Sequence, residues 1–392
     1  MLKTQYNICY LSYDGIADPL GQSQILPYLI KLNKINEFNF TIISFEKKRN
    51  LNKFSQLKLK LKKEKINWIS LTYRKHPPVL STLVDLIKLN IVLKKELKNN
   101  GIDFIHCRSY ITSLIGLKFK KKYKIPFLFD MRGFYADERI DGKIWNKNNF
   151  IFNLIYKFFK YKEKQFLQLS NHTISLTLKG KKEIQSWKLP NLSPITIIPC
   201  CTDSNLFSTE NVMDLRPELG LKSGDFVISY IGSLGTWYML DEMLDFFKIL
   251  LNKHKKSKFL FITKDNPDQI FKKCLKKNIS NKSILVKEAS RDLMPSYIGI
   301  SNFSIFFILP LYSKKASSPT KMGEIMSLGI PVICNSDVGD IDEIMKKSMP
   351  ELLVHNFNSH DYDRITDLIL NNYKADTEKI IQTSRYYYSL KN

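Results

Sequence analysis

The residues from Ser318 to Glu324 combine types that can bind a diphosphate and a ribose. Ser318 is a suitable N-cap and Pro319 a suitable first helical residue, so a helix is predicted to begin here. The free amides of Thr320 and Lys321, the positive end of the helix dipole and the Lys321 ammonium would then form an anion site. Glu324, about one turn further on, can accept two vicinal hydroxyls of a ribose. An ordinary well-capped helix would carry the same residues.

The surroundings of this helix favour a ligand site at the end of a parallel strand. An apolar run at residues 303–309 is typical of a buried strand, and a polar loop joins it to the helix. Gly323 leaves space beside Glu324 for a close ligand. Gly329-Ile330-Pro331 ends the short helix and returns the chain to the next strand.

The first half of the chain has its own candidates. Asp130 and Arg132 follow a predicted strand at residues 127–129 and place charges at its carboxyl end. They are candidate polar site groups, although they could also form a buried structural pair. Gly21, in the loop expected after the first strand, can bring a backbone amide to phosphates, and ordinary turn chemistry is the alternative for Gly15 and Gly21.

Short apolar runs alternate with helical patterns along both halves. This alternation predicts two α/β units, each a doubly wound parallel sheet with helices on both faces. The predicted strands are residues 8–11, 40–45, 68–71, 104–107, 127–129, 173–176, 227–232, 259–263, 283–286, 303–309 and 332–334. The predicted helices are residues 23–32, 83–97, 150–169, 240–252, 269–277, 319–328 and 341–347.

A turn-rich segment at residues 189–199 marks the expected seam between the domains. We expect an N-terminal domain at 1–195 and a C-terminal domain at 196–375, which contains the candidate diphosphate site. A C-terminal helix at 376–392 is expected to pack back toward the N-terminal domain. In open parallel sheets ligands bind at the carboxyl ends of the strands, so two such sheets joined by one linker are expected to face each other across a binding cleft.

The charge is distributed unevenly. The chain of 392 residues carries a net charge of +24, but residues 1–200 hold 36 basic against 14 acidic residues, and residues 201–392 are nearly balanced. An AT-rich genome would enrich lysine in both halves, so the asymmetry indicates an acidic partner for the first half: anionic lipid, nucleic acid or a phosphorylated substrate.

Two basic apolar patches suggest an anionic membrane as that partner. The first has lysines interleaved with leucines at residues 57–65, and the second has aromatic residues and lysines at 150–162. Such segments can lie on anionic lipid, and a core helix with a solvated lysine face is the alternative for each. Nucleic acid is not expected as a partner, because no nucleic-acid reading module is recognised.

The remaining features favour a cytoplasmic protein without a bound metal. No signal peptide is recognised, and the most apolar run is too short to span a bilayer. The six cysteines show no paired C-x-x-C spacing, and no Asp-x-Asp metal signature stands out. We expect a cytoplasmic location at the inner face of the membrane, and no cofactor.

Four stretches resemble one known family. SPTKMGEIMSLGIPVI at residues 318–333 resembles the donor-binding signature of the retaining GT-B glycosyltransferases of family 4, the group 1 glycosyltransferases. Residues 14–27, which include GQSQILP, are similar to the N-terminal loop and first helix of one branch. Residues 198–203 resemble the interdomain strand, and YIGSLG at residues 230–235 opens the second domain as the family does.

The resemblance implies a GT-B fold, with an acceptor-binding domain at 1–195, a nucleotide-sugar domain at 196–375 and a specific set of donor contacts. It also implies acceptor-binding or catalytic roles for Asp130 and Arg132. Glu324 would hold the donor ribose, and the turn from Ser318 to Lys321, with Pro319 and Thr320 inside it, would meet the diphosphate. The resemblance also implies metal-independent transfer with retention, by front-face attack in which the leaving phosphate helps to deprotonate the acceptor. The barrier is the departure of the diphosphate, which preplaced cations and amides lower.

This chain departs from the family at two places. An earlier family glutamate corresponds to Ala316, which puts the identity of the transferred sugar in doubt. Members often carry Arg after the Gly232 position, and here Ser233 stands beside the expected donor site. Phosphate neutralisation is therefore expected to rest on Lys321, with Lys264 or Arg291 as helpers.

The sequence thus predicts a glycosyltransferase acting from a nucleoside-diphosphate sugar on a saccharide or lipid-linked saccharide acceptor, in cell-surface polysaccharide or lipopolysaccharide biosynthesis. Two alternatives remain. An epimerase or phosphorylase has the same architecture. An epimerase, however, needs additional acids and a histidine in the cleft, and the chain has only six histidines, which counts against this alternative. A catalytically degraded scaffold that binds polyanions or membranes is the other, favoured by Ala316 and Ser233.

Overall fold

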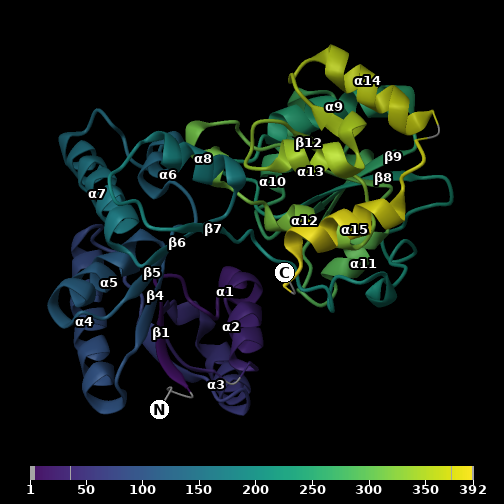
Figure 1. The fold of residues 1–392 in the computed structure, drawn as a ribbon. Helices are drawn as coiled ribbons and strands as arrows, with labels where there is room; N and C mark the ends of the chain where they lie inside the picture. The colour runs from purple at the N-terminus through teal and green to yellow at the C-terminus, as the bar shows by residue number, and fades with distance from the viewer. Residues whose placement is uncertain (1–4, 36, 372, 391–392) are drawn as a thin grey trace. The chain divides into compact units, whose positions relative to one another are not determined.

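The computed structural model describes residues 5–35, 37–371 and 373–390, and it divides the chain into two compact units, Met1–Ile198 and Pro199–Asn392 (Figure 1). Each unit contains one parallel sheet with helices on both faces. The predicted fold class, two doubly wound α/β domains, is therefore confirmed. None of the described helices is both long and apolar enough to cross a bilayer.

The first unit is built on seven parallel strands in the order β3-β2-β1-β4-β5-β6-β7. The strand order reverses between β1 and β4, which pair directly, and this is the position where doubly wound sheets bind ligands. The strands are β1 Tyr6–Ser12, β2 Phe38–Glu46, β3 Asn67–Thr72, β4 Phe104–Arg108, β5 Phe127–Asp130, β6 His172–Ser175 and β7 Ile195–Ile197.

Two groups of helices cover this sheet. In Figure 1, α1 to α3 lie on one side of the strands, and α4, α5 and α7 lie together on the other, where α5 contacts both of its neighbours. The helices are α1 Pro19–Gln24, α2 Leu26–Asn33, α3 Phe54–Lys63, α4 Leu80–Asn100, α5 Ser109–Tyr123, α6 Tyr135–Asp141, α7 Phe150–Leu169 and α8 Leu178–Ser186.

The second unit has six parallel strands in the order β10-β9-β8-β11-β12-β13, with the reversal between β8 and β11. The strands are β8 Phe226–Ile231, β9 Ser257–Ile262, β10 Ile284–Lys287, β11 Phe303–Phe306, β12 Val332–Asn335 and β13 Leu353–Val354. The helices are α9 Leu240–Lys253, α10 Asp268–Lys276, α11 Met294–Gly299, α12 Thr320–Ser327, α13 Ile341–Ser348, α14 Ser359–Leu370 and α15 Thr377–Tyr388.

The C-terminal helix α15 packs against α12 and α13 of the second unit. Gly323 of α12 makes this close approach possible, because a Cβ atom there would lie 2.5 Å from Thr202 Oγ1 and 2.6 Å from Tyr388 Cγ. The predicted role of Gly323, to leave space for a ligand, is therefore wrong, since protein atoms occupy that space. The predicted packing of the last helix toward the N-terminal domain stays a prediction.

Candidate functional site

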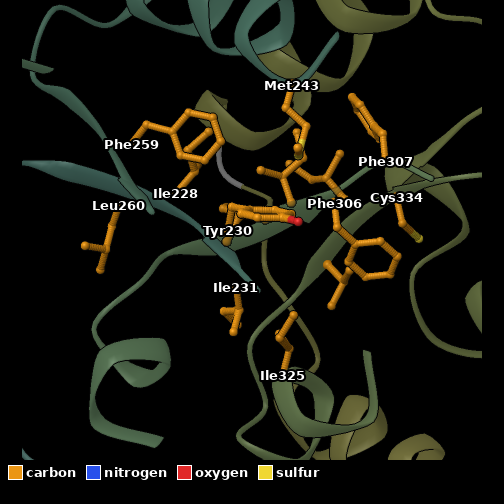
Figure 2. Close-up of a cluster of buried hydrophobic side chains, with 14 of the residues drawn as sticks. Ile228, Tyr230, Ile231, Met243, Phe259, Leu260, Phe306, Phe307, Ile325 and Cys334 are labelled. Carbon is orange, nitrogen blue, oxygen red and sulfur yellow. The ribbon is translucent and has the colours of Figure 1, made fainter. Parts of the chain in front are cut away.

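In the second unit, Lys321 lies at the point where the strand order of the sheet reverses, between β8 and β11. The Lys321 ammonium lies 4.4 Å from the ring centre of Tyr230 on β8 and 5.8 Å from that of Phe306 on β11. Both aromatic residues belong to the hydrophobic core, and Tyr230 occupies the middle of the cluster drawn in Figure 2. Lys321 is only 9% exposed, and burial pushes its pKa well below the usual value for lysine, against a raising effect from Glu324.

Glu324, one turn further along α12, is paired with a predicted helper. Arg291, from the loop before α11, donates a hydrogen bond to Glu324 Oε1 at 3.1 Å. Burial raises the pKa of Glu324, while Arg291 and then Lys321 lower it, with a net rise. Three of the predicted donor-site residues, Lys321, Glu324 and Arg291, therefore lie together.

The start of α12 differs from the prediction by one residue. The helix begins at Thr320, and Pro319 is extended, with φ −71° and ψ 107°. Ser318 is not the N-cap, because its hydroxyl accepts a hydrogen bond from the Cys200 amide at 3.2 Å. The Ser318 hydroxyl thus holds the first residues of the second unit. Thr320 and Lys321 still form the first turn of α12, whose amides have no intrahelical acceptor.

Ser233 lies beside this group, in the loop after β8. Its carbonyl accepts a short hydrogen bond from the Tyr230 hydroxyl, which itself accepts one from Lys321 at 3.3 Å. Gly232, with φ +115°, lets the loop pass the lysine, because a Cβ atom there would lie 3.0 Å from the Lys321 nitrogen.

The other predicted helper, Lys264, lies on the surface. Its side chain is 69% exposed and forms an ion pair of 3.0 Å with Glu288. The structure therefore does not bring the Lys264 ammonium to the buried Lys321, and exposed ion pairs of this kind contribute little to stability.

In the first unit, Asp130 lies at the carboxyl end of β5 and is surrounded by basic groups. His106 Nε2 is 3.5 Å and Arg108 Nη1 is 3.7 Å from Asp130 Oδ2, and Arg132 Nη1 is 3.8 Å from Oδ1. Burial alone would raise the pKa of Asp130, but Arg132, His106 and Arg108 outweigh it and hold the pKa below its usual value. We call Asp130, Arg132, His106, Arg108 and Asp14 the Asp130 cluster; Asp14 Oδ2 lies 3.6 Å from Arg108 Nε.

Three buried atoms of this cluster have no hydrogen-bond partner among the described residues: His106 Nε2, Arg108 Nε and Asp130 Oδ1. Buried polar groups are normally hydrogen-bonded, so each of these atoms needs an explanation, and a catalytic role or a bound polar molecule is one. The arrangement can therefore bind hydroxyl groups through both donors and acceptors. It is more than the simple Asp130–Arg132 pair of the alternative interpretation.

His106, Arg108 and Asp14 were not predicted as site residues. The sequence pattern could have identified Arg108 as a site residue, because Arg108 ends β4 just as Asp130 ends the next strand, β5. In the parallel pairing of these strands Arg108 lies opposite Asp130. Charged residues at the ends of successive predicted strands meet at one edge of the sheet.

Gly21 lies inside helix α1 rather than in a loop. A Cβ atom there would come within 2.3 Å of the Gly15 carbonyl oxygen and 2.4 Å of Ile16 Cα. Close packing of α1 on the loop after β1 therefore requires a glycine at this position. The same loop is held by the buried Glu46 carboxylate, which accepts hydrogen bonds from the amides of Ile16 and Ala17 at 2.7 and 3.2 Å.

Two doubly wound parallel sheets, one in each unit, are the architecture of the GT-B class, and solved structures of that fold are similar over nearly the whole chain. Sucrose-phosphate synthase from Thermosynechococcus elongatus has a TM-score of 0.73 at 13% identity, over 99% of this chain and 96% of that one. HepE of Anabaena, in complex with UDP and glucose, has a TM-score of 0.68 at 14% identity, over 98% and 95%. A UDP-GlcNAc 2-epimerase from Neisseria meningitidis has a TM-score of 0.58 at 13% identity, over 98% and 96%.

The family is given by two models that together match most of the chain. Glycosyltransferase Family 4 matches residues 46–206, and Glycosyl transferases group 1 matches residues 212–386. The chain belongs to these glycosyltransferases and is an enzyme of glycosyl transfer. This match, rather than the fold, distinguishes it from an epimerase. No curated protein matches the chain.

Proposed function

We propose that this enzyme transfers a sugar, with retention and without a metal, from a nucleoside-diphosphate sugar to a saccharide or lipid-linked saccharide acceptor in cell-surface polysaccharide or lipopolysaccharide biosynthesis. The observation that carries the proposal is the group of Lys321, Glu324 and Arg291 at the reversal between β8 and β11. A cation and the first amides of a helix suit a diphosphate, and a carboxylate suits ribose hydroxyls. The fold neighbour HepE, solved with UDP, supports a uridine nucleotide.

In this proposal Lys321 and the α12 amides stabilise the charge that develops on the leaving diphosphate. The Asp130 cluster binds hydroxyl groups of the reacting sugars, because His106 Nε2, Arg108 Nε and Asp130 Oδ1 are buried in ion pairs of 3.5–3.8 Å but make no hydrogen bond to the described residues. The leaving phosphate takes the acceptor proton on the same face of the sugar, so that the glycosidic bond forms with retention. Product stereochemistry, measured by NMR of the anomeric proton, distinguishes retention from inversion.

The donor site is tested by thermal shift with UDP, GDP and their sugars. At a concentration of about 100 times Kd, one donor is expected to stabilise the protein by about 2.7 kcal/mol and to raise Tm by about 5 °C or more. Glu324→Gln should abolish most of this rise, because a neutral amide cannot accept from both Arg291 and two ribose hydroxyls. Glu343→Gln, at an exposed position on α13, is the matched control.

Two results would contradict the donor site. In one, the wild-type Tm does not change with any nucleotide. In the other, Glu324→Gln retains the full rise while its unliganded Tm remains close to that of the wild type.

A membrane-bound acceptor is part of the proposal, and its support comes from α4 and α7. Apolar side chains three or four residues apart are exposed along each helix, opposite the buried face. On α4 they are Leu80, Leu83, Val84, Ile87 and Ile91, and on α7 they are Phe150, Ile151, Leu154, Phe158 and Tyr161. A solvated helix normally exposes polar residues instead, so each stripe is suited to a second apolar environment.

Charge favours an anionic bilayer as that environment. Helices α4, α5 and α7 contain twelve lysines, of which nine are exposed. Their three acidic residues, Asp85, Glu96 and Glu163, are all buried. The surface of these three helices therefore carries positive charge beside exposed apolar side chains, as interfacial helices do.

The other predicted patch, on α3, does not support membrane contact in the same way. Leu57 and Leu61 are buried in the core, and Leu59 alone of the three leucines is exposed. The alternative interpretation, a core helix with a solvated lysine face, describes α3.

Membrane binding is tested by co-sedimentation with vesicles. Wild type should bind phosphatidylglycerol-containing vesicles at low salt, bind pure phosphatidylcholine much less, and dissociate as salt rises. A variant with Ile87→Ser, Ile91→Ser, Leu154→Ser and Phe158→Ser should bind at least tenfold more weakly, because four exposed apolar side chains no longer enter the bilayer. Leu275→Ser, at an exposed position on α10, is the control; equal binding by wild type and the fourfold variant would refute this surface.

A further inference from the structure

Lys321 is a buried cation held by aromatic rings. Its ammonium lies 3.6 Å from the ring centre of Tyr238 and 4.4 Å from that of Tyr230. A buried ammonium normally needs a carboxylate partner, because desolvation of the charge is costly. The nearest such group on its own helix, Glu324, instead accepts its hydrogen bond from Arg291.

The contacts of Lys321 with aromatic rings, rather than with a carboxylate, favour the binding of an anionic ligand. The face of an aromatic ring carries partial negative charge and attracts a cation, and a desolvated contact contributes up to about 2 kcal/mol. A carboxylate in the same place would cancel the lysine charge and repel a diphosphate. Rings stabilise the ammonium without adding a formal negative charge to the site.

The rings also fix where the ammonium lies. Tyr230 accepts a hydrogen bond from Lys321 and donates one to the carbonyl of Ser233, so one hydroxyl connects the lysine to the loop after β8. Gly232 lies against the Lys321 nitrogen in the same loop. The ammonium is thereby held at the carboxyl end of β8, beside the reversal of strand order.

We propose that Tyr238 and Tyr230 are positioning residues that hold the Lys321 ammonium in place of a carboxylate, so that its full charge acts on the diphosphate of the donor. This inference rests on the proposed function. It assigns to Tyr238 a role that the sequence did not indicate.

The pH dependence of binding follows from the groups that face Lys321. These are Tyr230 on β8, Tyr238 before α9, and Glu324 on α12 with its partner Arg291. Burial lowers the pKa of Lys321, and burial raises that of Tyr230, with Tyr238 and Asp265 adding to the rise. Lys321 must be protonated to attract the diphosphate, so binding weakens as pH rises through its lowered pKa. Loss of an aromatic ring face lowers the pKa of Lys321 further. The loss of diphosphate binding with rising pH then begins at a lower pH.

The experiment is a calorimetric titration with UDP and with inorganic pyrophosphate between pH 6.5 and 9. Tyr238→Leu, which removes the ring, should bind both probes about tenfold more weakly at pH 8, and its binding should decline at lower pH than that of the wild type. Tyr238→Phe, which keeps the ring, should bind within twofold of the wild type with an unchanged pH profile. A merely structural role for the tyrosine would not move the pH profile.

Two further variants complete the test. Tyr386→Leu removes an exposed ring that also lies against a lysine, 4.1 Å from Lys347, and should bind as the wild type does. Tyr230→Phe keeps the core packing, removes only the hydroxyl, and should weaken binding about threefold even if Tyr238→Leu fails to fold.

The outcomes separate this inference from the proposed function. If the wild type binds neither probe, the proposed donor site fails and the positioning role fails with it. If the wild type binds and Tyr238→Leu, or in its absence Tyr230→Phe, has the same affinity and pH profile, the positioning role alone is refuted.

Discussion

Lys321→Met is expected to lower kcat by about a hundredfold while leaving the protein folded and no less stable. Departure of the diphosphate creates negative charge, and removal of one preorganised group that stabilises such charge typically costs 10²–10³ in kcat. A hundredfold loss corresponds to about 2.7 kcal/mol of transition-state stabilisation. Methionine has a similar length and makes favourable contacts with aromatic rings, so Tyr230 and Tyr238 can still pack around it.

Stability should change in the opposite direction to activity. The folded-state pKa of Lys321 is well below the unfolded value of 10.5, so the charged lysine opposes folding at neutral pH. This cost is complete below the lowered pKa and disappears as pH rises toward 10.5, where the lysine is neutral in both states. Lys321→Met should therefore be more stable than wild type near pH 7, and the difference should narrow as pH rises.

The measurements are steady-state transfer kinetics and urea unfolding at pH 7 and pH 9.5. Lys264→Met is the control, because Lys264 is exposed and paired with Glu288, away from the buried Lys321. The kcat of the Lys264→Met enzyme should differ from that of the wild type by less than twofold. A Lys321→Met enzyme with more than a fifth of wild-type kcat would exclude Lys321 from stabilising the leaving group. A kcat loss for Lys264→Met as large as that for Lys321→Met would place the exposed lysine in the reaction instead.

Much of the fold could be predicted, because most strands are short apolar runs between polar turns and several helices are amphipathic. Helix α7 begins and ends where its pattern predicts, and α12 differs by one residue at each end. Helix α5 was missed because eight of its fifteen residues are buried, so it shows no polar face until its last turns. Strand β13 has only two residues, too few for any periodicity.

The candidate sites were predictable where one segment supplies the chemistry. Lys321 and Glu324 are three residues apart on one helix, so their proximity follows from helical geometry. The rings around Lys321 could not be predicted in this way, because Tyr230 is 91 residues distant in sequence and meets the lysine only through the packing of α12 on the sheet. Ser318 was misjudged for the same reason, since its partner is the amide of Cys200, 118 residues away.

Asp130→Asn is expected to destabilise the first unit by about 3 kcal/mol at pH 7 and to lower transfer about a hundredfold. Asparagine keeps the shape of the side chain but removes the buried carboxylate that faces Arg108, Arg132 and His106. The half-exposed Asp14 then remains beside Arg108. Loss of one partner from a buried ion pair typically costs 3–5 kcal/mol, because the remaining charge is buried and uncompensated. Loss of the carboxylate also removes the acceptor that the proposed function assigns to sugar hydroxyls.

Asp14→Asn is the matched control for Asp130→Asn. Both aspartates approach Arg108 at similar distances, 3.6 and 3.7 Å, but the Asp14 side chain is 49% exposed and that of Asp130 only 6%. Solvent screens the exposed pair, so Asp14→Asn should cost less than about 1 kcal/mol. If both variants lose the same stability, burial of Asp130 is not the reason for its effect.

The pH dependence gives a second, independent readout. Asp130 has a folded-state pKa below the unfolded value of 3.8, so its contribution to stability is complete above about pH 4. The contribution disappears as pH falls through the lower, folded-state pKa. The stability difference between wild type and Asp130→Asn should therefore be constant from pH 5 to 7 and shrink below pH 4. A difference that does not shrink would show that the lost stability comes from packing rather than from charge.

Donor binding should be unaffected by Asp130→Asn, because the proposed donor site is built from residues of the second unit. Titration with UDP is expected to give wild-type affinity, while transfer kinetics show the loss in kcat or in acceptor KM. This separation assigns the Asp130 cluster to the reacting sugars, and the Lys321 group to the leaving diphosphate. A large loss of UDP affinity in Asp130→Asn would contradict that assignment, because it would make a group of the first unit part of the nucleotide site.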